Sequence, residues 1–324
     1  MEQQIYTLFS THTQYNKSTC TLYAKKLSQW VSYISPPTTH PQSIDILFGR
    51  PENILHSLKT RPDIKQTPAN IHIYVSALIA YLDYIQPRSD TQQTQLKSWK
   101  AIQKENWAPR AEHYNMNQPT SMQSDKVISM ESISATRDSL EYASPARILL
   151  SMYSLIEPVR ADYYATEIIS AANIQPIEDN YIILYSETPK IIIREFKTQK
   201  RYTTLEIPIP QQLVNEIRDS LIKTPRRYLF VSEDNPIYPM TRKTFSNWAC
   251  RTLARVFGRP MTLTALRHAY ISSLDFNRPV KELDTISKRM GHSLEMQRRY
   301  EWKVSSPPPT PPPSEGHFTA DPQP

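Results

Sequence analysis

Near its C-terminal end the chain reads TLTALRHAY at residues 262–270 and RMGHSLEMQRRYE at residues 289–301. These stretches hold an ordered polar series, in which Arg267 is followed by a Gly-His pair ending at His292 and then by Tyr300. Helix packing by itself does not require these residue types at set intervals. An arginine binds a phosphate with two hydrogen bonds, a histidine donates to a phosphate oxygen or moves a proton, and a tyrosine hydroxyl attacks phosphorus. The series therefore predicts phosphate chemistry.

The composition sets bounds on the function. A chain of 324 residues has room for two domains, and a net charge of +7 suits a polyanion such as DNA, although many basic proteins bind no acidic partner. The two cysteines, Cys20 and Cys250, lie in no metal-binding or paired pattern, so we expect neither a zinc site nor a disulfide framework. Four glycines form no nucleotide-binding loop. We expect no cofactor.

Residues 1–88 are predicted to form a small helical domain. Apolar residues recur at helical spacing over 19–34 and again over 68–85. Lys25 and Lys26 lie on the polar face of the first of these helices. The prediction is a helical bundle with basic edges.

Residues 89–125 are polar and rich in Pro, Asn, Gln and Ser, which indicates an irregular linker with one short helix near residues 96–103. At the other end of the chain, residues 305–324 are rich in proline and are predicted to be disordered, because such a composition cannot build a core.

Three runs of β-branched and aromatic residues, at 181–185, 190–196 and 202–208, predict the strands of a small antiparallel sheet. The basic segment 197–201 separates the second strand from the third. Helical patterns precede and follow the three runs. The second domain, at 126–304, is therefore predicted to be α+β.

The motifs Leu-Arg-His-Ala-Tyr and Met-Gly-His-Ser, followed by a late Tyr, resemble the catalytic end of the tyrosine recombinases. These integrases and site-specific recombinases cut and rejoin DNA through a 3′-phosphotyrosine. The resemblance covers residues 5–304 and is strongest at 262–300. It implies a mainly α fold with a small antiparallel β-sheet, in which an N-terminal helical core-binding domain that clamps DNA precedes an α+β catalytic domain at 126–304.

The resemblance also implies catalytic residues: Arg160, Lys197, Arg267, His292 and, as the nucleophile, Tyr300. The family commonly has Gly-Leu before the first arginine and Glu three residues after it. This chain has Pro-Val before Arg160 and an aspartate, Asp162, two residues after it. The resemblance implies that this aspartate stabilises the turn that carries Arg160. That form is similar to the recombinases of virophages and large DNA viruses.

Two positions depart from the family pattern or leave alternatives open. Lys200 competes with Lys197 as the lysine that protonates the leaving oxygen. The family's auxiliary histidine, three residues before the second arginine, is replaced by Thr264. The neighbouring His268 is interpreted as structural, and so are the other candidate tyrosines of the series, Tyr163, Tyr164 and Tyr270.

Arg242 and Lys243 are the favoured DNA contacts. They follow Thr241, a predicted N-cap, and two cations at a helix N-terminus oppose the helix dipole unless an anion lies nearby. The matching family helix enters the major groove. Further DNA-binding candidates on the basic surface are Lys200, Lys25 and Lys26.

The implied function is site-specific recombination without ATP or metal, integrating viral or mobile-element DNA. The expected partners are double-stranded DNA and a homotetramer at synapsis, with a free monomer or dimer, and Trp302 as a possible start of a contact between protomers. Without a signal-peptide pattern or an apolar run of about 20 residues, we expect no membrane partner and an intracellular location at the target DNA, in the host nucleus or cytoplasm or carried in a virion. The alternatives are a type IB topoisomerase or telomere resolvase, an inactive DNA-binding module, or a helical scaffold.

Overall fold

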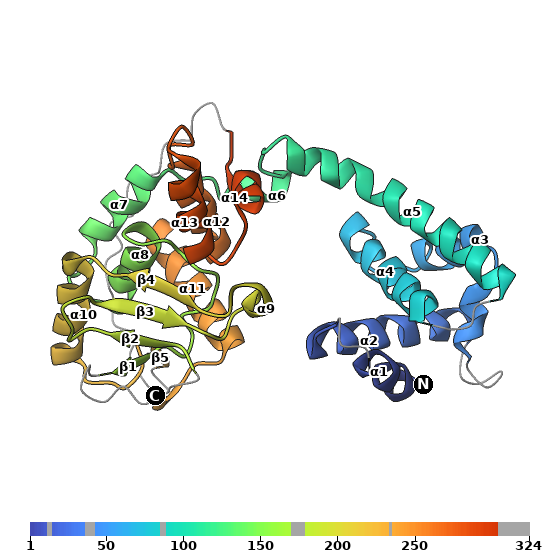
Figure 1. Ribbon diagram of the computed structural model, residues 1–324, viewed down its shortest axis with the longest axis horizontal. Coiled ribbons are helices and arrows are strands. Elements are labelled where there is room, and N and C mark those ends of the chain that lie inside the picture. The colour runs from blue at the N-terminus through green and yellow to red at the C-terminus, as the bar shows by residue number, and fades with distance from the viewer. Residues whose placement is uncertain (12–14, 36–42, 85–88, 170–178, 233–234, 304–324) are drawn as a thin grey trace, which may run out of the picture. The chain divides into compact units, whose positions relative to one another are not determined.

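A computed structural model describes residues 1–11, 15–35, 43–84, 89–169, 179–232 and 235–303, and for 109–115 and 122 the backbone alone. The chain folds into two compact units, Met1–Tyr114 and Asn115–Pro324, which are described separately (Figure 1). The Pro-rich tail predicted at 305–324 lies outside the described residues. Within the described part of the chain, no helix combines the length and apolar character that a bilayer span requires.

The first unit is helical, as predicted. Its elements are α1 (Glu2–Ser10), α2 (Lys17–Ile34), a 3-10 helix (Ile44–Phe48), α3 (Pro51–Lys59), α4 (Pro68–Tyr84) and α5 (Asp90–Asn115). Asn16 caps α2 by accepting from the backbone N–H of Thr19. Trp30 is fully buried and meets Trp99 and Tyr74 edge to face, with ring centroids 5.6 and 6.0 Å apart. Large apolar area thereby fixes α2 against α4 and α5.

The prediction of an irregular linker at 89–125 is wrong over Asp90–Asn115, because these residues form one long helix, α5. The helix is polar apart from a narrow apolar face. On that face the side chain of Leu96 is 6% exposed and that of Trp99 is 0% exposed. Its stability comes from packing these apolar residues against the other helices of the first unit, a tertiary contribution that local composition does not reveal. The first unit consequently extends to Tyr114.

The second unit combines helices with two small sheets, and the predicted mainly α architecture is confirmed. Its helices are α6 (Ser121–Ser124), α7 (Met130–Ser139), α8 (Pro145–Ser154), α9 (Gln199–Tyr202), α10 (Gln211–Lys223), α11 (Arg242–Phe257), α12 (Leu263–Ser272), α13 (Val280–Arg289) and α14 (Leu294–Tyr300). Its strands are β1 (Glu167–Ile169), β2 (Tyr181–Ile183), β3 (Lys190–Ile193), β4 (Leu205–Pro208), β5 (Val231–Ser232) and β6 (Asn235–Pro239).

The main sheet has the order β1-β2-β3-β4, which Figure 1 shows from β4 at the top to β1 at the bottom. The three predicted strands correspond to β2, β3 and β4, and they pair antiparallel. The short strand β1 adds a parallel edge that the sequence did not predict. The chain between β3 and β4 includes the one-turn helix α9, so the third strand begins at Leu205 rather than at residue 202.

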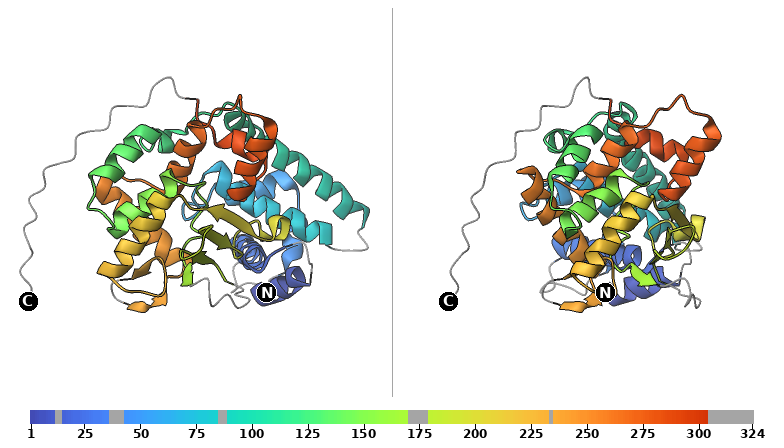
Figure 2. Two further views of the ribbon diagram at one scale, coloured as in Figure 1. Left: turned by 60° about the vertical axis from the view of Figure 1, so that its left-hand side comes forward. Right: turned by 90° about the vertical axis from the view of Figure 1, so that its left-hand side faces the viewer.

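Helix α8 is the centre of the second unit and contacts α7, α10, α11 and α12. Ser144 caps its N-terminus and Pro145 occupies the first turn, where its missing N–H costs nothing. Every residue from Ile148 to Tyr153 is buried, so the helix is covered on all sides. Figures 1 and 2 show α12, α13 and α14 grouped together at the end of the described chain, and α12 packs on α8.

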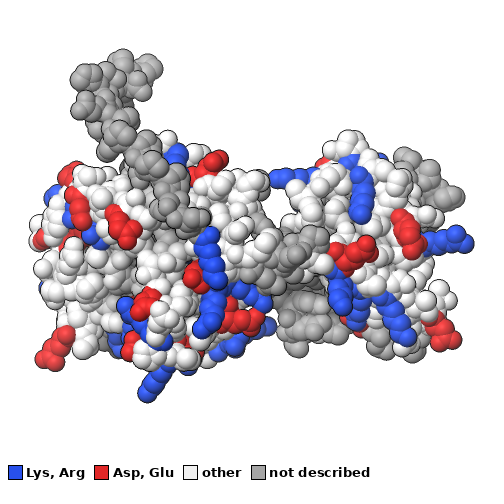
Figure 3. Space-filling model, turned by 90° about the horizontal axis from the view of Figure 1, so that it is seen from above, with Lys and Arg blue, Asp and Glu red and all other residues white. Residues whose placement is uncertain are grey.

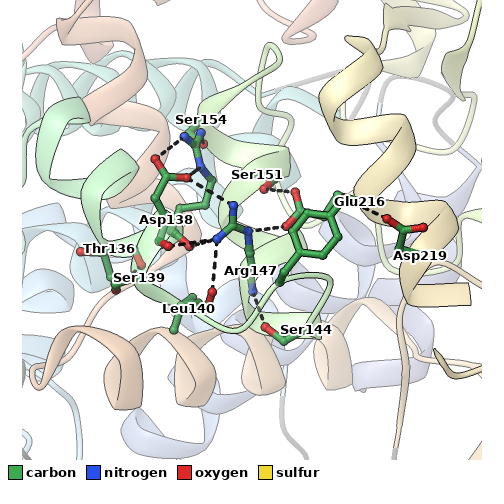
Figure 4. Close-up of polar contacts among 12 residues, drawn as sticks. Thr136, Asp138, Ser139, Leu140, Ser144, Arg147, Ser151, Ser154, Glu216 and Asp219 are labelled. Atoms are coloured by element: carbon green, nitrogen blue, oxygen red, sulfur yellow. Dashed lines mark hydrogen bonds and ion pairs between the residues drawn. The ribbon is translucent and has the colours of Figure 1, made fainter.

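A buried ion pair holds three of these helices together (Figure 4). Arg147 on α8 donates from Nε to Glu216 on α10 at 2.8 Å, and Glu216 is 1% exposed. Ser151 donates to the second carboxylate oxygen at 2.7 Å. Nη1 of Arg147 donates to the carbonyl groups of Arg137, Asp138 and Leu140 at 3.1–3.2 Å. The last carbonyls of a helix lack the usual donors of a following turn, and within the described chain only that of Arg137 also accepts from a backbone N–H, that of Leu140, so Arg147 acts as a C-terminal cap of α7.

Candidate active site

Arg267 lies on α12 and is 1% exposed. Its Nη1 donates to the carbonyl of Pro158 at 2.6 Å, and its Nη2 lies 3.2 Å from Nδ1 of His292. Because arginine has only donors, Nδ1 accepts, and the hydrogen-bond pattern places the proton of His292 on Nε2. The guanidinium carbon lies 5.5 Å from the ring centroid of Tyr300. The structure thus brings together the predicted second arginine, histidine and tyrosine.

His292 is a neutral donor in this site. It is 3% exposed, and burial, together with the charges of Arg267 and Arg160, lowers its pKa to about 3. Burial and the charge of Arg160 also lower the pKa of Arg267, which remains charged because an arginine ordinarily titrates above pH 12. The site therefore presents two positive charges beside an uncharged N–H donor.

Nε of Arg267 and Nε2 of His292 are buried N–H groups with no hydrogen-bond partner among the described residues. An unpaired buried donor costs about 1–3 kcal/mol. Both groups donate, and the charge of Arg160 acts on both side chains. An anion with several oxygens, such as a phosphodiester, would satisfy them with charge-assisted hydrogen bonds.

Arg160 lies in the turn that follows α8. Its side chain is half-buried, and its backbone carbonyl accepts from the hydroxyl of Tyr153 at 2.6 Å. The same turn carries Pro158, whose carbonyl binds Arg267. A hydrogen bond therefore links the turn that carries the first predicted arginine to the second arginine.

Asp162 fixes this turn. It is 2% exposed, its backbone carbonyl accepts from Asn180 Nδ2 at 2.9 Å, and its carboxylate is paired with Arg242 on α11. The guanidinium of Arg242 also lies over the ring of Tyr164, 5.1 Å from its centroid. Arg242, predicted as a DNA contact, is thus engaged by the turn, while the neighbouring Lys243 is exposed at the start of α11.

The loop between α13 and α14, residues 290–293, carries Gly291 and His292 and is called the Gly-His loop. It packs against the turn between β3 and β4. Gly291 has φ +69°, and a Cβ there would lie 3.3 Å from Leu205 Cδ1 and 3.4 Å from Thr198 Oγ1. Thr198 Oγ1 donates to the carbonyl of Gly291 at 2.7 Å. Lys197, adjacent to Thr198, is exposed, and Lys200 is exposed on α9. Both lysine candidates therefore flank a turn that contacts the loop carrying the predicted histidine.

Two further residues that the sequence did not reveal hold this loop. Arg289, at the end of α13, donates to Glu157 at 2.8 Å, and Glu157 lies in the turn before Arg160. Arg289 opens the stretch 289–301, two residues before Gly291, but the sequence predicted no role for it or for Glu157. This ion pair fixes the start of the Gly-His loop, and the bond from Thr198 fixes the loop at Gly291, next to His292.

Tyr300 is the last residue of α14, a short helix capped by Ser293. Its ring is half-buried, and its centroid lies 5.6 Å from that of His292. The competing tyrosines have other surroundings. Tyr163 is fully buried against Tyr153, and the hydroxyl of Tyr164 donates to Glu195.

The position that holds a histidine in the family, Thr264, is exposed on the first turn of α12. His268, interpreted as structural from the sequence, is 8% exposed and lies against Tyr300, with ring centroids 4.7 Å apart. The structure therefore places a histidine in contact with the predicted nucleophile, one residue after Arg267 rather than three before it.

The other predicted DNA contacts lie in the first unit. Lys25 is exposed on α2, whereas Lys26 is partly buried, donates to Tyr74 Oη at 3.2 Å and lies over that ring. Burial lowers the pKa of Lys26. On the face that Figure 3 presents, Lys and Arg side chains are interspersed with Asp and Glu side chains. The net positive charge of the chain is therefore not gathered into a single basic patch on that face.

No protein-family model and no curated protein matches the chain. Among solved structures, the chain is similar to the Tn1549 transposon integrase in complex with a circular intermediate DNA, with 12% identity, a TM-score of 0.50, and 94% of this chain and 96% of that chain covered. It is also similar to the crystal structure of XerA recombinase, with 13% identity, a TM-score of 0.42, and coverage of 94% and 95%. Both are tyrosine recombinases. The likeness to the Tn1549 integrase shows that this chain has the fold of a tyrosine recombinase.

Proposed function

We propose that this chain is a site-specific DNA recombinase that cuts and rejoins strands through a 3′-phosphotyrosine, with Tyr300 as the nucleophile. The observation that carries the proposal is the buried site in which Arg267, His292 and Tyr300 meet. Two N–H donors of that site have no partner within the described chain, and the oxygens of a phosphodiester would satisfy both. The recombinase fold supports the proposal.

In the proposed reaction the Tyr300 oxygen forms a bond to the scissile phosphorus and loses its proton to water. The bond to the 5′ oxygen breaks, and the electron pair leaves with that oxygen. Arg160 and Arg267 neutralise the non-bridging oxygens, and Nε2–H of His292 donates a further hydrogen bond. Donors fixed before the reaction stabilise the charge that develops in the transition state.

A lysine of the β3–β4 turn protonates the departing 5′ oxygen. Lys197 is the first candidate, because its neighbour Thr198 is bonded to the Gly-His loop, and Lys200 is the second. Rejoining reverses the step when a 5′ hydroxyl attacks the phosphotyrosine. The bond to tyrosine conserves the energy of the phosphodiester, so the reaction needs no ATP or metal.

The proposed partner is double-stranded DNA, and the presence of DNA in the Tn1549 integrase structure supports it. Exchange between two duplexes requires four cleaved strands, which a homotetramer assembled from monomers or dimers supplies. The first unit, with Lys25 exposed on α2, acts as a DNA clamp. The enzyme works inside the cell at its target DNA and integrates viral or mobile-element DNA.

The test uses nicked duplexes that tile the DNA on either side of the gene encoding the chain. A nick beside the cleavage point lets a short fragment diffuse away and traps the covalent adduct. Wild type, Tyr300→Phe and Tyr270→Phe are incubated with the duplexes without metal and separated on a denaturing gel. We expect a DNA-linked band with wild type and Tyr270→Phe, and none with Tyr300→Phe.

The absence of an adduct from wild type, on duplexes that both it and Tyr300→Phe bind, would show that the chain is a DNA-binding module. A Tyr300-dependent adduct together with relaxation of supercoiled plasmid and no strand exchange would identify a type IB topoisomerase. Hairpin products would identify a telomere resolvase. Salt-sensitive DNA binding is expected of all these proteins and does not separate them.

A further inference from the structure

Three contacts tie the backbone carbonyl of Tyr300 and the nearby Trp302 to helix α12. Nδ1 of His268 lies 2.6 Å from the backbone carbonyl of Tyr300. The His268 ring stacks on the ring of Trp302, with centroids 4.0 Å apart and planes 6° apart. The backbone N–H of Trp302 donates to Ser272 Oγ at 2.7 Å. His268 and Ser272 lie one turn apart on the same helix.

The hydrogen bond defines the state of His268. A carbonyl only accepts, so Nδ1 carries the proton. Burial, followed by the nearby charge of Arg267, lowers the pKa of His268 to about 4. The ring is therefore neutral at neutral pH, with its single N–H directed at the Tyr300 carbonyl.

Tyr300 needs such an anchor because its own helix is short. Helix α14 has seven residues and ends at Tyr300, and Glu301 continues in an extended conformation. A helix of this length is not stable by itself, and the carbonyl of its last residue has no partner within the helix. The position of the Tyr300 ring is consequently set by contacts outside α14.

Trp302 completes the anchor on the C-terminal side. It is 7% exposed and belongs to the hydrophobic core of the second unit. The sequence suggested it as the start of a contact with another protomer, and within this chain the ring packs on His268 and on the core of the second unit. The chain after the predicted nucleophile is thus held on α12 as far as Trp302.

Helix α12 also carries Arg267, which binds His292 and the Pro158 carbonyl. Two consecutive residues of one helix thus face the two reactants: Arg267 lies in the phosphate site and His268 holds the backbone of the nucleophile. We propose that His268, with Trp302 stacked on it, is a positioning residue that sets Tyr300 for in-line attack. This inference rests on the proposed function.

The test compares two substitutions that separate the hydrogen bond from the ring. His268→Phe keeps an aromatic ring between Tyr300 and Trp302 and removes the donor. His268→Asn places an amide N–H near the position of Nδ1 and removes the ring. The matched control is His72→Phe in the first unit, where the His72 ring lies against that of Trp107, with centroids 4.2 Å and planes 31° apart.

For each protein we would measure the single-turnover rate of adduct formation at saturating DNA, the Kd for DNA, and the thermal midpoint. We expect His268→Phe to lower the rate about 10- to 100-fold with an unchanged Kd, because a misplaced reacting group loses rate rather than affinity. His268→Asn should recover a rate above that of His268→Phe. His72→Phe should react at the wild-type rate.

A folded His268→Phe that reacts at the wild-type rate, or a His268→Asn no faster than His268→Phe, would overturn the positioning role and leave the proposed function intact. Absence of an adduct from wild type would overturn both. If His268→Phe does not fold, Ser272→Ala decides, because it removes the acceptor for the Trp302 N–H. A several-fold lower rate at unchanged Kd supports the anchor, and a wild-type rate contradicts it.

Discussion

Arg267 on α12 and His292 in the loop between α13 and α14 are joined by a hydrogen bond of 3.2 Å between Nη2 of the arginine and Nδ1 of the histidine. The bond fixes the tautomer of His292 and leaves its Nε2–H as a donor without a partner in the described chain. The arginine therefore has two roles in the proposed reaction. It offers its own charge to the phosphate, and it orients the neutral histidine that donates beside it.

This relationship predicts an acid-sensitive fold. A histidine in the unfolded chain titrates near pH 6.5, whereas the folded pKa of His292 is about 3, because burial and the charges of Arg267 and Arg160 oppose protonation. Between these values the unfolded chain binds more protons. The contribution of His292 to stability is therefore complete above pH 6.5 and is lost as the pH falls toward 3.

The measurement is the free energy of unfolding of the second unit in urea at about pH 7.5 and about pH 5. Wild type should lose about 1–2 kcal/mol more than His292→Gln over this interval, since glutamine does not titrate. Equal losses in the two proteins would show that His292 is not held neutral by the fold.

Two glycines with positive φ offer a matched pair of substitutions. Gly258 (φ +64°) has no atom within 4 Å of an added Cβ, whereas at Gly291 (φ +69°) the Cβ meets Leu205 and Thr198 at 3.3 and 3.4 Å. Gly258→Ala should cost only the strain of the left-handed conformation, about 1–2 kcal/mol. Gly291→Ala should cost more and also displace His292, lowering the cleavage rate about tenfold or more.

Urea unfolding and single-turnover cleavage of the two alanine variants check this prediction. The discriminating quantity is cleavage per folded molecule, which should fall for Gly291→Ala alone. Equal cleavage by both variants would mean that the contact between the Gly-His loop and the β3–β4 turn does not position the histidine.

The sequence predicted the parts of the site whose signals are local. Arg267, His292 and Tyr300 were recognisable because polar residues interrupt apolar helical patterns in a set order, and strands β2, β3 and β4 because β-branched runs alternate with turns. Their convergence in one buried site is a property of the fold. The sequence shows the order of these residues along the chain, whereas the packing of α12 on α14 and α8 brings their side chains close together.

What the sequence did not predict depends on pairs far apart in the chain. The sequence predicted Arg242 as a DNA contact at a helix N-terminus. In the structure its guanidinium pairs with the buried Asp162, which lies 80 residues away in the chain. No sequence pattern predicted a role for Thr198, whose hydroxyl donates to the carbonyl of Gly291, 93 residues away in the chain. The polar helix α5 likewise depends on the first unit that it packs against. None of these contacts has a local pattern to recognise.

The buried pair between Arg147 and Glu216 predicts a large loss of stability on truncation. Glu216→Ala leaves the guanidinium of Arg147, whose side chain is 13% exposed, with only the exposed carboxylate of Asp138 at 3.5 Å, and breaking a buried pair costs about 3–5 kcal/mol. The matched change Glu295→Ala removes the partner of Arg299 in a pair that is 74% and 46% exposed, which is worth about 0–1 kcal/mol. Urea unfolding of both variants measures the difference, and losses of similar size would contradict a structural role for the Arg147 network.

The lysine that protonates the leaving oxygen can be assigned by changing the leaving group. An alcohol oxygen needs a proton as it departs, whereas a thiol, with a pKa near 8.5, leaves as the anion. Replacing the 5′ bridging oxygen of the scissile phosphate by sulfur should therefore restore cleavage by a variant that lacks only the acid. We expect Lys197→Ala to cleave the ordinary duplex at least about 100-fold more slowly than wild type and the sulfur-containing duplex at nearly the wild-type rate.

Lys200→Ala is the matched control from the same turn. Lys197 is favoured over it because Thr198 bonds the carbonyl of Gly291 at 2.7 Å, which holds the backbone next to Lys197 against the loop of His292. Lys200 lies on the short helix α9, beyond that contact. Sulfur rescue of Lys200→Ala, with Lys197→Ala cleaving normally, would assign the acid to Lys200 instead. A defect in Lys197→Ala that sulfur does not relieve would mean that this lysine contacts the phosphate and gives no proton to the leaving oxygen.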